Sequence, residues 1–406
     1  MLIVQKYGGT SVGSKERIKA VAERAVRTKR EGHDVVLIVS AMSGETDRLI
    51  NLAQEISQNP STRDMDMLLS SGERISAALT AIAIESLGER SLSLSGRQAG
   101  VFTTCEHTRA KIEKVDAARV LVALKEGFIP VIAGFQGITN TGADVTTLGR
   151  GGSDLSAVAM SAAIRADLCE IYTDVDGVYT TDPNVVKNAR KLTKISYDEM
   201  LELASLGAKV LQTRSVEYAK KYDVPVVVRS SFNDVPGTLV IKEDSEMEKV
   251  VVSGVAYDKN QVKLTVRGVP DRPGIASTLF TNIADAGIVV DMIVQNISTD
   301  SKAADISFTV PKTDSKAAQA ITEKVAGELK AEGVVLNDNI SKISIIGAGM
   351  RTHSGAAAKM FQTLSSNNIN IMMISTSEIK ISCVIDAKYT ELAVRELHDA
   401  FELAAA

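Results

Sequence analysis

Several loops in this sequence place glycines, hydroxyl groups and charges directly after short apolar runs. In the first loop Lys6 comes before Gly8 and Gly9, so the backbone can approach a ligand closely. The helical pattern that follows would direct its N–H groups and positive end at that ligand. A phosphate group suits this arrangement, and a plain tight turn explains it equally well. The loop is neither a Walker A loop nor a dinucleotide fingerprint, because the lysine precedes the glycines and the spacing differs.

Two further loops have a similar character. Residues 40–47 combine small and hydroxyl side chains at the end of an apolar run, which suits ligand contact or an ordinary helix N-cap. Residues 147–154 are more specific, because three glycines accompany Arg150, which can grip a carboxylate or phosphate through two parallel hydrogen bonds. Asp154 falls in the first turn of the next helix, where stabilising the helix dipole is the structural alternative. This combination of residues favours a binding function.

A fourth loop, residues 172–183, is polar and turns through Asp176 and Gly177. Such a loop can hold the ribose and base of a nucleotide, and carboxylates that face phosphates usually act through Mg²⁺ or orient a donor. Lys209 is a candidate for a further phosphate contact, and a solvated surface lysine is the alternative.

These loops need a scaffold that brings the ends of several strands together. The runs that read as strands are residues 2–6, 35–40, 130–135, 170–174 and 225–228. Most are continuous and rich in β-branched residues, as in strands buried on both faces. They alternate with helical patterns, the first from Lys15 to Arg30. The chain is therefore predicted to be an α/β protein with a mainly parallel sheet sandwiched by helices.

The pattern changes after residue 232, and 406 residues are too many for one core. We predict a first domain at 1–232, a linker at 233–249 and a second region at 250–406. Gly274 and Gly355 are 81 positions apart, as are Ile288 and Ile369. This repeat predicts two ferredoxin-like α+β units, although two similar units could also arise by chance.

Composition excludes several classes of function. A net charge of −4 gives no reason to expect a nucleic-acid partner. The apolar runs are too short to span a membrane, and the chain opens on a strand-like run rather than a signal peptide, so a cytoplasmic location is expected. The three cysteines and four histidines are scattered, which predicts buried reduced thiols and no metal site held by the protein.

Taken together, the motifs are specific where each alone is not. The segments 6–12, 40–46, 71–73, 134–135, 149–154 and 173–183 occur in an order that resembles the amino-acid kinase family, in particular its aspartate kinases. The carboxy-terminal repeat resembles a pair of ACT domains, about 263–335 and about 343–406, with residues 250–257 completing the second. The resemblance covers essentially the whole chain.

By this resemblance the chain phosphorylates the side chain of L-aspartate with ATP and Mg²⁺, the first step toward lysine, threonine and methionine. Lys6 and Asp154 would be catalytic. The residues expected in the substrate pocket are Ser40, Thr46, Glu73, Phe135, Arg150, Gly151 and Ser153. Arg150 would hold the α-carboxylate and Glu73 the ammonium group. The residues expected to contact ATP are Tyr7, Gly8, Gly9, Thr10, Thr173, Asp174, Tyr179, Asp182 and Lys209.

The same resemblance implies feedback inhibition by lysine, threonine or both, bound between ACT domains. The residues expected to bind the effector are Asp271, Asp291, Gln295, Ala356, Ala357, Asn370, Ile371 and Ser377. For Asp271 a turn-forming role before Arg-Pro-Gly is the alternative. Members of the family usually dimerise through these domains, so a homodimer or higher oligomer is expected, and a shorter chain of ACT domains alone is a possible further partner.

Two positions depart from the family pattern. Asn184 stands where an arginine often follows Asp-Pro, which puts ATP affinity in doubt unless Lys187 substitutes. Val289-Val290 replaces the usual Asn-Ile, which the second unit keeps, so one effector site is expected to be better formed than the other. Two other functions remain as alternatives: a kinase for glutamate, acetylglutamate or carbamate, and an amino-acid sensor with an inactive kinase domain. The relatives with those other substrates lack the ACT tail.

Overall fold

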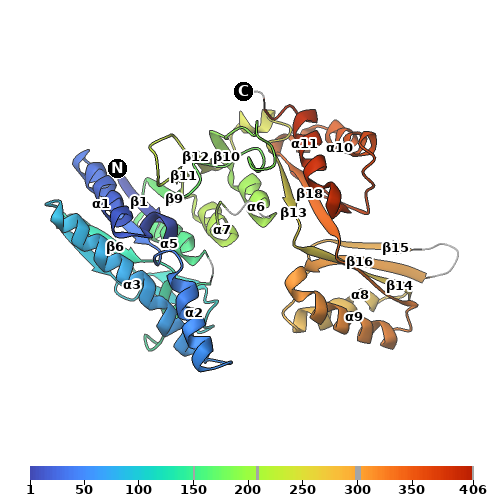
Figure 1. Cartoon of the computed structure of the whole chain (residues 1–406), viewed down its shortest axis with the longest axis horizontal. Helices are drawn as coiled ribbons and strands as arrows, with labels where there is room; N and C mark the ends of the chain where they lie inside the picture. Colours follow the sequence, from blue (N-terminus) through green and yellow to red (C-terminus); the bar gives the residue numbers. More distant parts are fainter. Residues whose placement is uncertain (150, 207–209, 298–302, 405–406) are drawn as a thin grey trace. The chain divides into compact units, whose positions relative to one another are not determined.

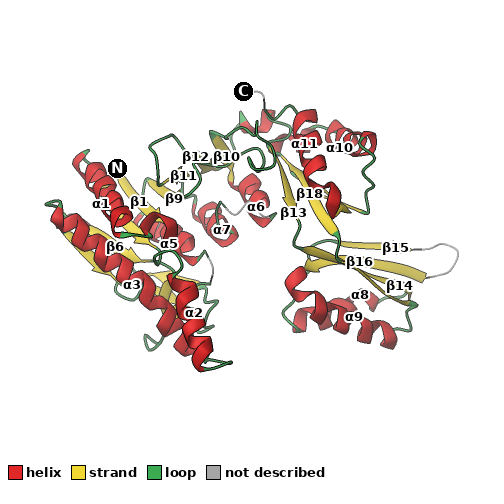
Figure 2. Cartoon of the chain, in the orientation of Figure 1, coloured by secondary structure: helices red, strands yellow, loops and turns green. Residues whose placement is uncertain are grey.

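The structure, a computed structural model, describes residues 1–149, 151–206, 210–297 and 303–404 (Figure 1). The described chain forms two compact units. The first unit comprises Met1–Tyr179 and Lys191–Met247, and the second comprises Thr180–Arg190 and the chain from Glu248 onward. Each unit is built on sheets covered by helices, as Figure 2 shows by colour.

The first unit contains an eight-stranded sheet in the order β10-β12-β11-β9-β1-β2-β6-β3. Its strands are β1 (Leu2–Tyr7), β2 (Asp34–Val39), β3 (Ser91–Leu94), β6 (Ile129–Ala133), β9 (Leu168–Thr173), β10 (Lys194–Ser196), β11 (Val226–Ser230) and β12 (Thr238–Ile241). All neighbours pair in parallel except β11 and β12. The central strands are buried on both faces, which explains their continuous apolar runs. The predicted fold class is confirmed.

Helices cover both faces of this sheet. They are α1 (Lys15–Arg30), α2 (Glu45–Ile56), α3 (Thr62–Ser86), α4 (Ala118–Lys125), α5 (Gly152–Ile164), α6 (Tyr197–Ser205) and α7 (Thr213–Tyr222). On one face α1 and α3 pack on a core that includes Tyr7, Leu37 and Val39. On the other face α5 contacts β1, β2 and β9 and packs against α7. Among the described residues only α3 is long and apolar enough to cross a bilayer, and 56% of that stretch is buried inside the protein.

A smaller sheet lies in the same unit, with strand order β5-β4-β7-β8. Its strands are β4 (Val101–Thr103), β5 (Ile112–Val115), β7 (Gln136–Thr139) and β8 (Val145–Thr147). The side-chain amide of Gln136 donates to the carbonyl of Ser70 at 2.9 Å, which ties this sheet to α3.

The second unit holds two four-stranded antiparallel sheets, ordered β15-β16-β14-β17 and β13-β18-β20-β19. The first has β14 (Gln261–Pro270), α8 (Ile275–Asp285), β15 (Ile293–Ile297), β16 (Ala303–Pro311), α9 (Ser315–Glu328) and β17 (Gly333–Asn337). The second has β13 (Gly254–Asp258), β18 (Ile340–Ile346), α10 (Gly355–Ser366), β19 (Met373–Thr376), β20 (Lys380–Asp386) and α11 (Thr390–Ala400). Because β13 takes the edge position that β17 takes in the first sheet, the two ferredoxin-like folds are interlocked.

The internal repeat is visible in the backbone. After α8 and α10 the chain turns through Gly287, at φ 72°, and Asn368, at φ 55°, both left-handed conformations. Gly287 and Asn368 are 81 positions apart, which is the spacing of Gly274 and Gly355. The strands that follow begin at Ile293 and Met373, later than the apolar runs suggest. Residues 288–292 precede β15 and bond to β16 at single points, such as that from Asp291 N–H to the Thr309 carbonyl at 3.1 Å.

The boundary between the two halves differs from the predicted linker in two ways. Residues 233–249 include β12, because the run Thr238–Ile241 is apolar and β-branched enough to join the main sheet. Residues 180–190, here called the strap, belong to the second unit. Val186 of the strap is buried in a core cluster with Val252, Met360 and Leu397.

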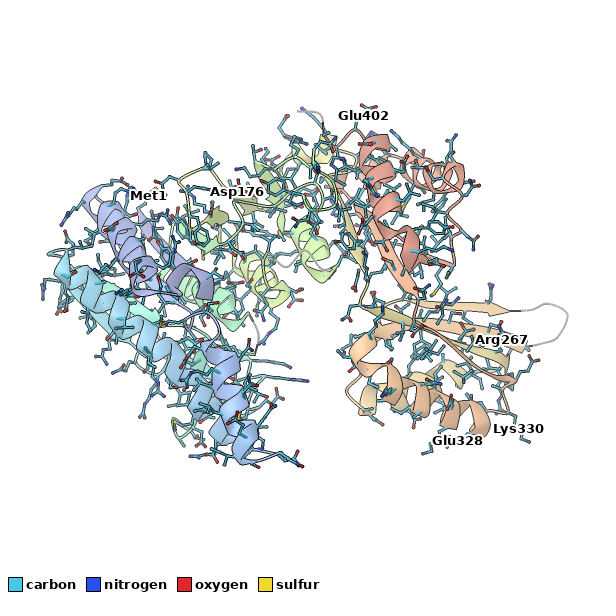
Figure 3. All side chains as sticks on the ribbon, in the orientation of Figure 1. Met1, Asp176, Arg267, Glu328, Lys330 and Glu402 are labelled. Atoms are coloured by element: carbon cyan, nitrogen blue, oxygen red, sulfur yellow. The ribbon has the colours of Figure 1, made fainter. Side chains whose placement is uncertain are left out.

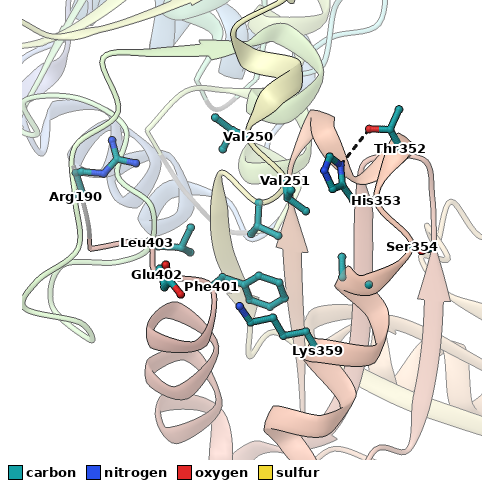
Figure 4. A pocket seen from close by; sticks show the side chains of 13 residues that line it. Arg190, Val250, Val251, Thr352, His353, Ser354, Lys359, Phe401, Glu402 and Leu403 are labelled. Atoms are coloured by element: carbon teal, nitrogen blue, oxygen red, sulfur yellow. Dashed lines mark hydrogen bonds between the residues drawn. The ribbon is translucent and has the colours of Figure 1, made fainter.

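Polar contacts fix the strap as well. Thr180 shares a hydrogen bond with the buried ring of His398 at 2.9 Å, and Tyr257 donates to the Asp182 carboxylate at 3.0 Å. Arg190 at the end of the strap is one wall of a groove of about 660 Å³, whose other walls include Val251, Lys359 and Phe401 (Figure 4). The last residues of the predicted nucleotide loop, 180–183, therefore belong to the second unit.

Candidate active site

The predicted loops converge because β9, β1, β2 and β6 are neighbours in a parallel sheet. Their carboxyl ends lie at one edge, which is where ligands bind in sheets of this kind. Backbone hydrogen bonds join the loops there: Gly8 N–H donates to the Tyr172 carbonyl at 3.1 Å, and Ser40 N–H to the Tyr7 carbonyl at 3.0 Å. Gly134 N–H likewise donates to the Val39 carbonyl at 3.0 Å.

Lys6 and Asp154 form an ion pair at this edge, with 2.7 Å between Nζ and Oδ1. Lys6 is 8% exposed and Asp154 is 8% exposed, so the pair is largely withdrawn from water. Asp154 lies in the first turn of α5, where a negative charge also complements the helix dipole. The ammonium group of Lys6 is thereby held beside the glycine loop. A Cβ atom on Gly8 would stand 3.4 Å from it.

The helix expected to follow the glycines begins at Lys15, as predicted, so a short segment separates it from Gly8 and Gly9. Residues 9–12 form a short 3₁₀ turn, and the Ser14 side chain caps α1. The N-terminus of α5 is the one directed at Lys6. Its N-cap is Gly151, which has a φ of 72° and on which a Cβ atom would stand 2.9 Å from the Gln212 side chain, so this position requires glycine. Arg150, predicted to hold a carboxylate, lies outside the described residues.

Phe135 connects the loop after β6 to this region. Its φ of 66° is a strained conformation for a bulky residue, of the kind that concentrates at functional sites. Its N–H donates to the Ser156 hydroxyl at 3.0 Å, and its carbonyl accepts from Leu148 N–H at 2.9 Å. Beside it, a Cβ atom on Gly134 would stand 2.9 Å from the Ser153 hydroxyl, so only glycine leaves room for that serine.

Glu73 projects from the buried face of α3 toward the loop after β2. Its Oε1 accepts from Ala41 N–H at 3.1 Å, while its Oε2 is buried and has no hydrogen-bond partner among the described residues. Burial raises the pKa of this carboxyl to about 7. A buried oxygen without a donor is suited to a cationic group of a ligand. Two further predicted pocket residues are half-buried. They are Ser40, next to Ala41, and Thr46, in the first turn of α2.

The predicted nucleotide residues of the first unit follow β9. The Thr173 hydroxyl donates to Asp174 at 3.0 Å, and Asp174 is exposed. The Tyr179 hydroxyl donates to Asp176 at 2.8 Å, and Lys191 donates to the same carboxylate at 3.2 Å; Figure 3 labels Asp176 in this loop. These contacts order the loop.

Other predicted nucleotide residues behave differently. The Tyr7 side chain is fully buried and stacks on Tyr172 with ring centroids 4.8 Å apart, so only its backbone remains available to a ligand. Lys209 lies outside the described residues. Asp182 belongs to the strap, where it accepts from the backbone and side-chain amides of Asn184 at 2.9 and 3.0 Å. Asn184, the departure from the family pattern, is thus held in a turn that the Asp182 side chain caps.

The predicted effector residues all lie in the second unit. Asp271 is exposed ahead of α8, Asp291 is ion-paired with the buried Lys342 of β18, and Gln295 is exposed on the edge strand β15. Ala356 and Ala357 begin α10. Asn370 and Ile371 precede the edge strand β19, and Ser377 follows it. The methionines Met292, Met372 and Met373 join the two folds in one small core cluster.

Arg214 was not identified from the sequence. From α7 it donates to the carbonyls of Leu148 and Ala110, at 2.8 and 3.0 Å, and so fixes the start of the loop that contains Gly149 and Gly151. Its spacing on an amphipathic helix is that of an ordinary surface arginine, so no local pattern signals this contact.

Comparison with known proteins agrees with this architecture. Residues 1–230 match the model of the amino acid kinase family, and residues 264–329 and 343–401 each match a model of the ACT domain. The chain is 53% identical over 407 residues to an aspartokinase of Helicobacter pylori, covering 99% of this chain and all of that protein.

Two solved structures of Escherichia coli aspartokinase III are also similar. One is a complex with aspartate and ADP in the R-state, with 26% identity and a TM-score of 0.81 over 98% of this chain and 99% of that one. The other is a complex with lysine and aspartate in the T-state, with 26% identity and a TM-score of 0.77 over the same shares.

Proposed function

The chain belongs to the amino acid kinase family as an aspartate kinase with two ACT domains, and from this premise we propose how its residues carry out and regulate the reaction. The γ-phosphoryl group of ATP passes to the side-chain carboxylate of L-aspartate, giving 4-phospho-L-aspartate and ADP. The observation that carries the proposal is the convergence of Lys6, Asp154 and Glu73 on one edge of the main sheet.

The chemistry suits these residues. A side-chain carboxylate is already ionised at neutral pH, so the acceptor needs no general base. Catalysis then depends on orientation and on positive charge near the transferring group. Lys6 supplies that charge, and Asp154 keeps its ammonium group in place at 2.7 Å. The free oxygen of Glu73 binds the ammonium group of aspartate, while Ser40, Thr46, Phe135, Gly151, Ser153 and Arg150 complete the pocket.

The glycine loop fits the phosphates of ATP. Gly8 and Gly9 carry no side chain, so the backbone can approach the phosphates closely, and a Cβ atom on Gly9 would stand 3.1 Å from the Ala41 carbonyl. Thr10 adds an exposed hydroxyl at the same place. The end of β9 and the loop after it, with Thr173, Asp174 and Tyr179, take the nucleoside, and Lys209 completes this side. Mg²⁺ arrives bound to the phosphates.

The direct test is to trap the acyl phosphate with hydroxylamine in the presence of ATP and Mg²⁺. Aspartate should give a hydroxamate, whereas glutamate, acetylglutamate and carbamate should not be used as acceptors. Product from glutamate in place of aspartate would contradict the proposed specificity. Absence of product from every acceptor would support the alternative of an amino-acid sensor with an inactive kinase domain.

We further infer that the product feeds lysine, threonine and methionine synthesis in the cytoplasm and that end products inhibit through the ACT domains. In the E. coli relative lysine is bound in the T-state, and this chain has two matching domains. Lysine, threonine or both would sit against Asp271, Asp291, Gln295, Ala356, Ala357, Asn370, Ile371 and Ser377. Both β15 and β19 are edge strands, which suits assembly of a dimer or higher oligomer through these domains.

Replacing Gln295 should separate regulation from catalysis. In Gln295→Ala we expect the concentration of effector that halves activity to rise about tenfold, with kcat within about twofold, because a side-chain hydrogen bond to a charged ligand is lost. Asn296→Ala is the matched control, since the next residue on a strand faces the opposite side. The measurement is activity titrated with lysine and threonine, singly and together. Unchanged inhibition in Gln295→Ala would contradict this effector site.

A further inference from the structure

A fully buried carboxylate near the proposed aspartate pocket is not explained by the roles given above. Asp66 lies on α3 with no exposed surface. It accepts hydrogen bonds from the Nδ1–H of His107 at 2.7 Å and from the Thr147 hydroxyl at 2.5 Å. Both of its oxygens also lie 3.1 Å from Thr108 N–H. A buried charge without such donors is strongly unfavourable, so these contacts form a satisfied cluster with a defined geometry.

The donors come from two segments that lie next to the loop that contains Gly149 and Gly151. His107 and Thr108 lie between β4 and β5, and Thr147 ends β8 directly before residues 148–152. Ala110 N–H donates to the Thr147 carbonyl at 3.0 Å. The carbonyl oxygen of Thr108 stands 3.3 Å from where a Cβ on Gly149 would be. Asp66 therefore anchors the start of this loop in two ways: through Thr147, which precedes it in the chain, and through residues 107–108, which lie beside it.

The same helix carries Glu73. Seven residues separate it from Asp66, which is two helical turns and returns to the same face. Both carboxylates are buried, and α3 is a continuous helix between them. In the proposed pocket Glu73 holds the ammonium group of aspartate, and Arg150, which lies outside the described residues, is assigned its α-carboxylate. The bonds to Asp66 thus connect the helix that carries Glu73 to the residues on both sides of the turn into Leu148 and Gly149.

We propose that Asp66 is a positioning residue for aspartate, acting through His107 and Thr147 on Leu148 and Gly149, which lead into the substrate pocket. This role rests on the proposed function of the pocket. The carboxylate of Asp66 is occupied by its own donors, so it acts through the loop. Among the three donors to Asp66, which are His107, Thr108 and Thr147, only His107 donates from a ring, and its side chain is 18% exposed.

The test is whether a variant raises the Michaelis constant (KM) for aspartate while leaving KM for ATP unchanged. In Asp66→Asn we expect KM for aspartate to rise about tenfold or more, because a donor now faces the donors of the cluster. KM for ATP and kcat should stay within about twofold to threefold. His107→Gln, which keeps a donor, should remain near the wild-type KM, whereas His107→Leu should resemble Asp66→Asn. Thr147→Val removes one donor at constant shape and should raise the same KM.

Arg63→Ala is the matched control. Arg63 also links α3 to the residue before β8, Asp144, at 2.7 Å, but Arg63 is exposed and Asp144 only half-buried, so this pair should contribute little. Equal increases in KM for aspartate and ATP, or a raised KM in Arg63→Ala, would show general loss of structure and overturn the proposal. If Asp66→Asn does not fold, Thr147→Val decides: an unchanged KM for aspartate in a folded Thr147→Val enzyme overturns the role.

The failure of this role can be told apart from failure of the proposed pocket. If Glu73→Gln leaves KM for aspartate unchanged while Asp66→Asn raises it, the assignment of Glu73 is wrong and the positioning role stands. If Glu73→Gln raises this KM and Asp66→Asn does not, Asp66 has no positioning role and the pocket stands.

Discussion

Replacing Lys6 with methionine is expected to lower kcat by about a thousandfold or more, while KM for aspartate changes by less than about threefold. The side chain keeps its length but loses the charge that offsets the negative oxygens of the transferring phosphoryl group. Because that charge acts mainly as the bond to the leaving group breaks, its loss should appear in turnover rather than in aspartate binding. Steady-state kinetics with both substrates varied will measure the split.

A second variant separates this role from a structural one. Lys6→Met leaves Asp154 unpaired in a buried site, which could disturb the loop by itself. In the double variant Lys6→Met/Asp154→Asn the charge imbalance is gone. Turnover that stays low in the double variant supports a catalytic Lys6. Turnover that returns to within about tenfold of wild type would show that the pair is structural.

Glu73→Gln is expected to raise KM for aspartate about tenfold to a hundredfold, with KM for ATP nearly unchanged. The amide can still accept from Ala41 N–H, as Oε1 of Glu73 does at 3.1 Å. What is lost is the charge that faces the substrate's ammonium group, and a hydrogen bond between charged groups is worth about 1.5–3 kcal/mol. Isothermal titration with aspartate will check the loss independently of turnover. Normal affinity in this variant would exclude Glu73 from the pocket.

The pH dependence of the wild-type enzyme provides a related test. Burial raises the pKa of Glu73 to about 7, and only the ionised form attracts the ammonium group. Below that pKa, kcat/KM for aspartate should therefore fall about tenfold per pH unit, although aspartate's own side chain stays ionised down to about pH 4. Glu73→Gln should lose this dependence. A wild-type profile that is flat between pH 5.5 and 8 would contradict the assignment.

The main sheet and the repeat were predictable because both depend on local patterns. Continuous β-branched runs such as Val35–Val39 identify strands buried on both faces, and the helix over Lys15–Arg30 was predicted with its observed bounds. The position of Lys6 and Asp154 in two motifs also suggested a shared site. Their contact follows from the adjacency of β1 and α5, which the alternation of strands and helices makes natural.

Other features depend on contacts between distant segments and have no local signal. Asp66 and Arg214 look like ordinary helical residues until the loops near residues 108 and 148 are seen beside them. The polar residues Asp66, Glu73 and Thr80 do recur every seven residues on α3, and this buried polar stripe is a pattern that could have pointed to Asp66. Nothing in residues 180–190 indicates by itself that they pack with the second unit.

The strap has a practical consequence for protein engineering. A regulatory half exchanged between two related enzymes by a single cut at the junction would be joined near Glu248. Such a chimera would combine one parent's Val186 with the other parent's Val252, Met360 and Leu397, and so would carry a mismatched core. A transplant that includes Thr180–Arg190 keeps these partners together. The smallest exchangeable regulatory module of this enzyme is therefore two pieces of chain, one of them inserted in the middle of the catalytic half.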